Sequence, residues 1–399
     1  MTEENMSKLE ELIEQYCPDG VEWKHLGEFC EIKTGKGITK KDSNENGTYP
    51  IISGGVTPMG YYHIFNREGR TVTISRVGAN AGLVSFIDKR FYLNDKCFSI
   101  IPSNGTNTKF LYYILSAREA DIKGMQSEGG VPTINTQKVG SIEIPLPPLP
   151  VQEEIVRVLD AFTELQAELQ AELQKRKQQY NFYRDNLLNF KNINRGGQEI
   201  KWMRLKDVAT QWYRGAGIKR EEVSNEGMPC IRYGEIHTSY NIWFKDCISH
   251  TDETKQATKK YAEYGDILFA ITSEDIPLVG NSVAYLGKEK IMVGGDIVVM
   301  KHHQDPRYMA YALSTSDAIK QKGKGKVKSK VVHTNVPSLQ EIVIPIPPME
   351  EQQRIADILD RFDTLTNDLT AGLPAEMEKR RQQYEFYRDK LLTFKRKEA

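Results

Sequence analysis

The sequence predicts an α/β (α+β) protein in which a long antiparallel two-helix coiled coil separates two globular α/β domains. Three observations predict this fold: an internal repeat that spans whole domains, β-rich runs in both globular parts, and two long apolar stripes with helical spacing. With 399 residues, the chain is long enough for two or three domains that each bury a core.

The internal repeat has a period of about 200 residues, far longer than the roughly 20 to 50 residues of a solenoid, so whole domains are duplicated. The helical segments are nearly the same in the two halves, whereas the globular segments share only scattered apolar positions. We therefore expect the helices to contact the same kind of partner in both halves and the globular domains to contact different ones. The paired segments are 21–32 with 200–211, 109–117 with 307–315, 131–145 with 331–345, and 175–190 with 379–394.

The repeat also sets the expected domain boundaries. Each globular domain ends at a proline pair, Pro147 and Pro148 or Pro347 and Pro348, which prevents an earlier helix start and leaves an extended entry into the next helix. The expected parts are an N-terminal helix at 1–20, a first globular domain at 21–145, a first helical spacer at 146–195, a second globular domain at 196–345 and a second helical spacer at 346–399.

The globular domains are predicted to be mixed α/β, with twisted strands joined by turns rich in Gly and Asn. The segment 107–122 fits one amphipathic helix, because Phe110, Tyr113, Ile114 and Ala117 fall on a shared face. The clearest strand candidates are 71–75, 82–87, 266–271 and 296–300.

Each helical spacer carries a coiled-coil-like apolar stripe. The first runs from Ile155 to Phe190 with one four-residue stutter, and the second runs from Ile355 to Phe394 with four extra residues. We expect the second helix to kink or break at 372–374, which contains a glycine and a proline. Two helices of about 40 residues, each roughly 60 Å long, can hold two domains apart. The alternative is that the stripes pack on each other inside a single domain.

Composition argues against several classes of protein. The sequence has no window of about 18 apolar residues, and its N-terminal segment is acidic, so we expect no membrane span, no signal peptide and a cytoplasmic location. The five cysteines form no C-x-x-C pair, which argues against a zinc site and a disulfide framework.

The formal net charge is zero, but residues 21–145 carry 15 Lys and Arg against 12 Asp and Glu, and residues 200–345 carry 21 against 17. Each globular domain therefore has a basic excess.

The segments that come nearest to catalytic motifs do not match them. TGKGITKK (34–41) lacks the spacing of a phosphate-binding loop, and RVGANAG (76–82) lacks the G-x-G-x-x-G pattern. Neither proline pair has the flanks of the [DNS]-P-P-[FYW] segment of amino-methylating enzymes, and PDGVEWK (18–24) is too tightly spaced for a nuclease metal cluster. His302 and His303 would point to opposite faces at the end of a strand. We therefore expect a chain that is not an enzyme.

Basic side chains on glycine-rich loops are the candidates for DNA contact. Lysine on a flexible loop can reach phosphates, and arginine can donate two hydrogen bonds to a guanine edge. A solvated surface loop is the alternative for any one of them, but the run KQKGKGKVKSK (320–330), with six lysines in eleven residues, favours phosphate contact. The candidates are Lys33, Lys36, Lys40, Lys41, Ser53 and Arg76 in the first domain, and Arg214, Lys219, Arg220, Arg232, Tyr233, Lys322, Lys324 and Lys326 in the second.

Taken together, these features resemble the specificity subunit of Type I DNA restriction-modification enzymes. The resemblance is carried by IPLPPLPVQEEIVRVLD (144–160) and IPIPPMEEQQRIADILD (344–360), and by RKQQYNFYRD (176–185) and GLPAEMEKRRQQYEFYRD (372–389). It spans essentially the whole chain. It implies two target recognition domains that each read one half of a split, asymmetric DNA site, with helical regions that set the gap between the halves. It also implies a pseudo-twofold internal repeat that seats two identical modification subunits.

The resemblance further implies that this subunit is not catalytic and binds no cofactor. The modification subunits bring S-adenosylmethionine and the adenine methyltransferase site, and restriction subunits, with ATP and Mg, join to cleave double-stranded DNA. The stretch ELQAELQAELQ (164–174) repeats QAEL, and one such unit adds about 6 Å of helix; we hypothesise that the number of units sets the gap. The alternatives are a structural coiled-coil scaffold with two protein-binding domains and a standalone methyltransferase or nuclease.

Overall fold

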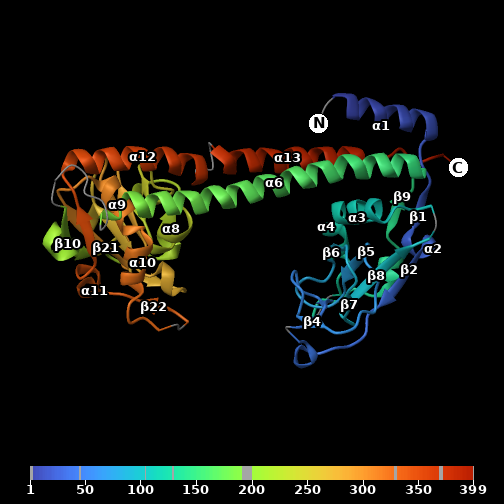
Figure 1. Ribbon diagram of the computed structural model, residues 1–399, viewed down its shortest axis with the longest axis horizontal. Helices are drawn as coiled ribbons and strands as arrows, with labels where there is room; N and C mark the ends of the chain where they lie inside the picture. Colours follow the sequence, from blue (N-terminus) through green and yellow to red (C-terminus); the bar gives the residue numbers. More distant parts are fainter. Residues whose placement is uncertain are drawn as a thin grey trace. The chain divides into compact units, whose positions relative to one another are not determined.

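The computed structural model describes residues 3–44, 46–103, 105–127, 130–190, 200–327, 330–367 and 372–398. The chain divides into two compact units. The first unit comprises Met1–Glu168 and Met377–Ala399, and the second comprises Leu169–Glu376. Each unit contains one globular domain and parts of the long helices (Figure 1).

The first globular domain is built on a four-stranded antiparallel sheet in the order β2-β8-β5-β6. A smaller sheet, β4-β3-β7, pairs β3 with β7 in parallel and β3 with β4 antiparallel. The strands predicted at 71–75 and 82–87 are confirmed as β5 and β6. The strands are β2 (Cys30–Thr34), β3 (Tyr49–Ile52), β4 (Tyr61–Tyr62), β5 (Thr71–Ser75), β6 (Val84–Ile87), β7 (Tyr92–Leu93) and β8 (Cys97–Pro102).

The helix predicted for 107–122 is two helices, α3 (Thr108–Ala117) and α4 (Glu119–Gly124). Phe110 and Ile114 are buried on the predicted face of α3, which lies between the four-stranded sheet and α6 (Figure 1). A single helix is wrong because Arg118 ends α3 with φ −105° and ψ 16°. Its guanidinium donates to the main-chain carbonyl of Glu143 and lies 5.0 Å from the centroid of the Trp23 ring, which ties this turn to the neighbouring strands.

The other elements of the first unit complete the domain around this sheet. Strands β1 and β9 pair antiparallel where the chain enters and leaves the domain. The bounds are α1 (Glu3–Tyr16), β1 (Trp23–His25), α2 (Leu26–Phe29), η1 (Lys40–Asp42), α5 (Thr136–Gly140) and β9 (Glu143–Pro145).

The second globular domain repeats the topology of the first. In its larger sheet, β11-β21-β17-β19-β14, the first four strands follow the order of β2-β8-β5-β6, and its second sheet, β12-β15-β13-β20-β16, contains the parallel pair β13–β20 where the first domain has β3–β7. The strands predicted at 266–271 and 296–300 are confirmed as β17 and β21. The strands are β11 (Ala209–Arg214), β12 (Val223–Ser224), β13 (Met228–Ile231), β14 (Trp243–Phe244), β15 (Ser249–Thr251), β16 (Tyr261–Ala262), β17 (Ile267–Ala270), β19 (Ser282–Tyr285), β20 (Ile291–Val293) and β21 (Ile297–His302).

The remaining elements of the second domain also follow the first. Strands β10 and β23 pair antiparallel like β1 and β9. A short pair, β18 and β22, stands where the first domain has a single bridge between Val77 and Thr133. The bounds are β10 (Lys201–Arg204), α7 (Leu205–Val208), η3 (Arg220–Glu222), α8 (Tyr233–Thr238), η4 (Glu253–Lys255), β18 (Thr272–Ser273), η5 (Ile276–Leu278), α9 (Pro306–Leu313), α10 (Ser316–Gly323), β22 (Val332–His333), α11 (Val336–Gln340) and β23 (Val343–Ile346).

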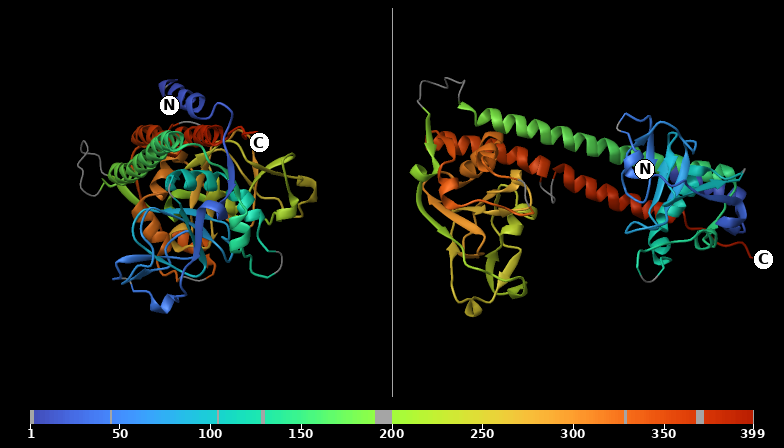
Figure 2. Two further views of the ribbon diagram at one scale, coloured as in Figure 1. Left: turned by 90° about the vertical axis from the view of Figure 1, so that its right-hand side faces the viewer. Right: turned by 90° about the horizontal axis from the view of Figure 1, so that it is seen from below.

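Each proline pair is followed by a long helical segment. The first is one uninterrupted helix, α6 (Leu149–Leu187), and the second is divided into α12 (Met349–Asn367) and α13 (Gly372–Leu391) (Figure 2). The predicted break is confirmed. Gly372 has a φ of +78°, and a Cβ at this position would lie 2.7 Å from the main-chain oxygen of Thr364, so only glycine fits without displacement.

The long helices pair through aromatic rings within each unit. In the first unit the ring of Phe162 on α6 stacks on Tyr387 of α13, with centroids 5.6 Å apart. In the second unit Tyr183 on α6 stacks on Phe362 of α12, with centroids 5.8 Å apart. Later residues of α6 thus meet earlier residues of the C-terminal helices, as in the antiparallel pairing that the sequence predicts.

Candidate nucleic-acid interface

Both predicted basic loops leave their sheets at a position that only glycine can occupy. Gly35 follows β2, and a Cβ there would lie 2.2 Å from the main-chain oxygen of Asn94. Gly215 follows β11, and a Cβ there would lie 2.1 Å from the main-chain oxygen of Gly294. The loops TGKGITKK (34–41) and RGAGIKRE (214–221) therefore start at equivalent points of the two domains.

A second pair of equivalent positions follows the central parallel strands. Ser53 comes directly after β3, and Arg232 comes directly after β13. In both domains the last carbonyl of this strand accepts a hydrogen bond of 2.9 Å, from the main-chain N–H of Asn94 in the first domain and of Gly294 in the second. The fold thus brings the basic loop and the end of the parallel strand to the same place twice.

In the second domain, four predicted residues share one hollow. We call it the arginine hollow; its volume is about 580 Å³. Four of the residues that line it are glycines, which lets a ligand approach the main chain closely. The residues that line it are Arg214, Gly217, Ile218, Arg220, Arg232, Tyr233, Gly234, Glu235, Thr238, Gly294, Gly295 and Asp296.

Two of the three arginines of the hollow lie next to carboxylates. Arg214 Nη2 lies 2.7 Å from Asp296 Oδ1, and Arg232 Nε lies 3.6 Å from Oε1 of Glu235, a buried carboxylate. Arg220 is exposed on η3, and no ion pair links it to another residue of the part of the chain that the structure describes. The hollow therefore presents guanidinium donors next to carboxylate acceptors, and base edges in the major groove carry the complementary acceptors and donors.

In the first domain, predicted residues gather around Asn94 and Asp95. The amide of Asn94 donates to the main-chain oxygen of Ile38 in the basic loop, at 2.8 Å. Arg76 Nη1 donates to the main-chain oxygen of Asp95, at 3.3 Å. Ser53 follows β3 here but is only 9% exposed, so little of its side chain is accessible. The basic loop, the end of β3 and Arg76 thus lie close together.

The other lysines of the first domain lie apart from this cluster or on its exposed rim. Lys33 forms a 2.7 Å ion pair with Glu31 and lines a different hollow, together with Arg67 and Arg70. Lys36 is exposed at the start of the basic loop, and Lys40 and Lys41 are exposed on η1. In the second domain, Lys219 is likewise exposed, directly before η3.

The prediction that Lys322 lies on the surface is wrong. The lysine run begins inside α10, where Ala318 and Lys322, four residues apart, share the buried face. Nζ of Lys322 donates to Ser282 Oγ at 3.2 Å and lies 6.0 Å from the centroid of the Phe269 ring. Burial lowers the pKa of Lys322 to about 7. The helical spacing to Ala318 was the signal in the sequence that could have placed Lys322 inside.

The rest of the lysine run agrees better with a surface role. Lys324 is exposed and Lys326 is half-buried in the segment that follows α10. Lys328, in the same run, lies outside the described residues. The part of the run that can reach a phosphate therefore starts after the helix ends.

Sequence reasoning did not single out Asp95 and Asp296, the carboxylates beside the two basic loops. Asp95 and Asp296 come shortly after the short strands β7 and β20. The carboxylate of Asp95 lies beside Gly37 of the first basic loop, and that of Asp296 accepts from Arg214 at the start of the second. An acidic residue close behind a β-rich run was the available signal. Carboxylates at these positions add acceptors, which can bind the amino groups of cytosine or adenine.

The buried thiols and histidines do not form a reactive site among the described residues. Burial raises the pKa of Cys30 to about 12, of Cys97 to about 11 and of Cys230 to about 12, so these thiols stay protonated at neutral pH. Burial also lowers the pKa of His302 to about 4. No group of three or more His, Cys, Asp or Glu is placed to hold a metal ion within the described ranges, and no described helix has the length and apolar character of a membrane span.

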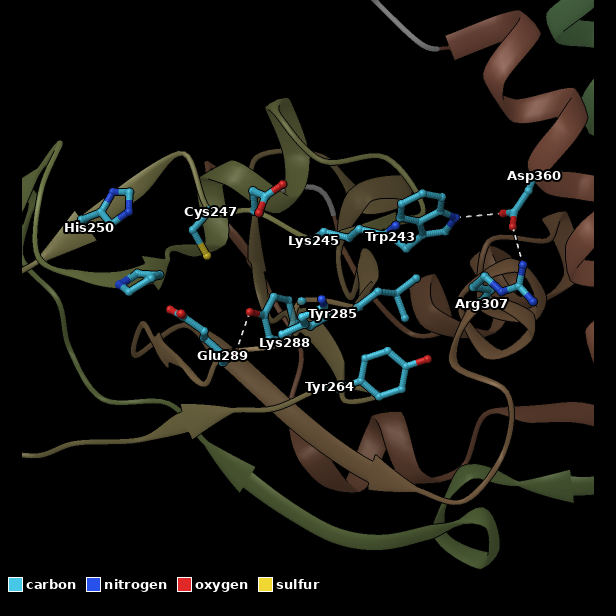
Figure 3. Close-up of a pocket in the computed structure, with 14 residues that line it drawn as sticks. Trp243, Lys245, Cys247, His250, Tyr264, Tyr285, Lys288, Glu289, Arg307 and Asp360 are labelled. Atoms are coloured by element: carbon cyan, nitrogen blue, oxygen red, sulfur yellow. Dashed lines mark hydrogen bonds and ion pairs between the residues drawn. The ribbon is translucent and has the colours of Figure 1, made fainter.

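A larger hollow of about 860 Å³ lies elsewhere in the second unit. None of the sequence-predicted site residues lines it, and its charged side chains have both signs. Figure 3 shows Asp360 of α12 in contact with Trp243 and Arg307 at its edge. One carboxylate of α12 thus reaches this hollow, which is otherwise lined by the globular domain.

Comparison with known proteins matches both halves of the chain to the same family model. A family model described as the Type I restriction modification DNA specificity domain matches residues 18–176 and again residues 198–379. Among curated proteins, the chain is similar to the Type I restriction enzyme EcoR124I/EcoR124II specificity subunit of Escherichia coli, with 30% identity over 99% of this chain and 98% of that protein. It is also similar to a putative type I restriction enzyme specificity subunit of Haemophilus influenzae, with 29% identity over 98% and 99%.

Solved structures share the fold. One is the Type-I restriction-modification system S subunit from M. genitalium, with a TM-score of 0.56 and 17% identity over 94% of this chain and 96% of that chain. Another is a chain from a structural study of complex assembly and conformational transition of the type I R-M system, with a TM-score of 0.61 and 16% identity over 94% and 98%. At these identities the likeness concerns the fold alone.

Proposed function

The chain belongs to the family of Type I restriction-modification DNA specificity subunits, and on that premise we propose that each globular domain reads one half of a split DNA site. The observation that carries this proposal is the equivalence of the two clusters. The same topology presents Lys36 and Ser53 in one domain and Ala216 and Arg232 in the other. A common scaffold with different side chains at its reading positions suits two dissimilar half-sites.

Within the second domain, the arginine hollow is the proposed reading surface. Arg220 is the side chain that is free to donate two hydrogen bonds to a guanine, while Arg214 and Arg232 are oriented by Asp296 and Glu235. The exposed lysines, including Lys219 and Lys324, are proposed to contact phosphates, which position the domain without reading sequence. In the first domain, Lys36, Lys40, Lys41 and Arg76 are proposed to play the corresponding roles, with Ser53 beside them.

The partners are proposed to be two modification subunits, followed by restriction subunits. The repeated segments QQYNFYRD and QQYEFYRD each leave one phenylalanine largely exposed, Phe182 at 64% and Phe386 at 65%. Two equal apolar side chains in two nearly identical segments suit two copies of one partner, because exposed aromatic residues are frequent anchors of protein interfaces.

The chain itself is proposed to be non-catalytic, to bind no cofactor and to act in the cytoplasm. S-adenosylmethionine would be bound by the modification subunit, and ATP and Mg by the restriction subunit.

The proposal is tested by the methylation pattern of the complex between this chain and its modification subunits. Arg220→Ala should relax or abolish recognition of bases in one half of the site only, with the other half and the gap unchanged. Lys245→Ala is the matched control, because Lys245 is an exposed cation of the same domain outside the arginine hollow. If Arg220→Ala lowers methylation equally at all sequences, or alters neither half, the assignment of the reading surface is wrong.

The scaffold alternative is not favoured, because the family match covers both globular domains and not the helices alone. A scaffold with two protein-binding domains would show no salt-dependent affinity for DNA. A DNA-reading complex should lose affinity steeply as salt rises, since each phosphate contact releases counterions. A standalone methyltransferase or nuclease would act with cofactor and without a partner chain.

A further inference from the structure

Five polar side chains tie each globular domain to the helix that follows it. In the first unit they are Asn107, Lys109, Tyr113, Gln152 and Asp160, and we call this set the first joint. The second joint comprises Asp305, Arg307, Tyr311, Gln352 and Asp360. The three residues of the packing helix and the two of the long helix have the same spacing in both sets, and the stretch between them is two residues longer in the second. The globular domains otherwise share only scattered apolar positions.

At the centre of each joint lies a buried glutamine. Gln152 Oε1 accepts the main-chain N–H of Asn107 at 2.8 Å, and its Nε2 donates to the main-chain oxygen of Pro147 at 2.7 Å. Gln352 repeats both hydrogen bonds, at 3.0 Å from the N–H of Asp305 and at 2.8 Å to the first proline of its own pair. One amide thus links the start of the domain's packing helix, the proline pair and the long helix.

A carboxylate two turns further along the long helix makes the second connection. In the first joint, Asp160 accepts from the hydroxyl of Tyr113 at 2.6 Å and from Nζ of Lys109 at 2.7 Å. Both donors lie on α3, whose first turn is capped by Asn107. The helix α3 is therefore held to α6 at two points, which fixes its rotation as well as its distance.

The second joint has the same connections and adds others, one of them from Trp243. Asp360 accepts from the hydroxyl of Tyr311 at 2.7 Å, from Nη1 of Arg307 at 2.7 Å and from Nε1 of Trp243 at 2.8 Å. Figure 3 shows the indole and the guanidinium meeting at the two oxygens of this carboxylate. Trp243 lies on β14, so its bond ties an edge strand of the large sheet to α12.

Stability alone does not explain why these polar sets recur. Apolar side chains of similar volume give comparable stability at a buried contact, but they tolerate small shifts and rotations between helices. Hydrogen bonds are directional, and a fully connected buried network favours one arrangement over its neighbours. The two domains differ elsewhere but keep the same network. The network is therefore required by the way in which each domain is attached to its long helix.

We infer that the two joints are positioning devices that fix the angle at which each recognition domain is held on its own helix. Through this angle they set how strictly the enzyme discriminates between gaps of different length in its split site. The inference rests on the proposed function and extends it, because it assigns gap tolerance to residues outside the DNA-reading clusters.

The test is a genome-wide methylation map of cells that express this chain with its modification subunits. Gln352→Met keeps the volume and removes the three hydrogen bonds that the Gln352 side chain makes in the second joint and to Gln304. Gln353→Met is the matched control, because it makes the same change at the neighbouring, exposed position of α12. We expect Gln352→Met to raise the share of methylated sites whose gap differs by one base pair by about tenfold, as the loss of a buried hydrogen bond would. Both half-site sequences should stay unchanged, and Gln353→Met should match the parent.

The inference is overturned if Gln352→Met forms the complex and methylates DNA with an unaltered gap, whatever its thermal stability. If the parent complex itself yields no split motif, the proposed function fails, and that outcome is separate from the first.

Asp360→Asn keeps the shape of the side chain and an acceptor for Tyr311, so it tests the same joint should Gln352→Met fail to fold. Asp360→Asn should widen the range of gap lengths less than Asp360→Leu does. Gap lengths that stay unchanged in both variants would also overturn the inference.

Discussion

At the scale of single residues, the burial of Lys322 is decided by its place on helix α10 and not by the charge pattern of its segment. Alternating lysines in the run 320–330 predict a solvated segment, yet the run begins on α10, where position 322 falls on the buried face. The amine donates to Ser282 beside the Phe269 ring, and its pKa is lowered to about 7 because burial disfavours the charged form.

The burial of Lys322 predicts a pH-dependent stability. Above about pH 7 the folded chain holds this amine neutral, whereas the unfolded chain keeps it protonated up to about pH 10.4, so the unfolded state binds more protons and stability rises with pH. Lys322→Met should therefore raise the free energy of unfolding at pH 7.5, by more than about 1 kcal/mol, and the gain should shrink toward pH 10. Urea unfolding at both pH values measures this. Lys324→Met, at an exposed position, should show no such trend; a pH-independent gain for Lys322→Met would contradict the burial.

Lys324 and Lys326, in the segment that follows α10, predict a salt effect of their own. If Lys324 and Lys326 each neutralise one phosphate, the double variant Lys324→Ala/Lys326→Ala should reduce the slope of log affinity against log salt by about 1.8. Affinity for unrelated duplexes should fall by the same factor as affinity for the specific site. DNA binding by the assembled complex at several salt concentrations measures both. An unchanged slope would show that these lysines do not touch phosphates.

At the scale of elements, the glycine at the start of each basic loop is a requirement of the fold. The space for a Cβ at Gly215 is occupied by the main-chain oxygen of Gly294, which cannot move without distorting β20 and its neighbours. Gly217, two residues on, has no atom within 4 Å of a Cβ. Gly215→Ala should therefore destabilise the second domain by about 1 to 3 kcal/mol, the usual cost of overpacking.

Calorimetry of Gly215→Ala and Gly217→Ala compares the two glycines directly. Gly217→Ala should leave the melting temperature of the second domain near that of the parent, because its backbone needs no left-handed conformation. Equal losses in the two variants would contradict the close approach at Gly215.

The QAEL units of α6 lead to a prediction about helix length. Each inserted unit extends α6 by about 6 Å and rotates the residues beyond it by about 40°. Inserting one unit after residue 169 should shift the gap of the methylated motif by one or two base pairs and leave both half-sites unchanged. Methylation mapping of the insertion variant measures this. An unaltered gap would show that α6 does not set the spacing.

At the scale of the whole molecule, the sequence predicted what depends on repetition and periodicity. The duplicated segments predicted two domains of the same topology, and the apolar stripes predicted α6 and the divided pair α12 and α13. The break at Gly372 followed from residue type alone. These features are encoded locally, by spacing and by backbone preferences.

What the sequence did not predict depends on contacts between distant segments. Arg118 divides α3 from α4 because its guanidinium reaches a carbonyl and a ring on other strands. Arg214, Arg220, Arg232 and Tyr233 were predicted as separate candidates, and their convergence with Asp296 in one hollow required the pairing of β13 with β20. The joints were also missed, because a buried glutamine reads as an ordinary polar residue until its partners are known.

The central claim is that two dissimilar DNA-reading domains are held by helices at a set separation. Its most direct test is a single-molecule methylation map of a methylation-free host that expresses the parent chain with its modification subunits. We predict one motif, made of two unlike specific halves separated by a gap of fixed length and unspecified sequence. A continuous motif, or a correctly assembled complex that leaves the genome unmethylated, would contradict the claim.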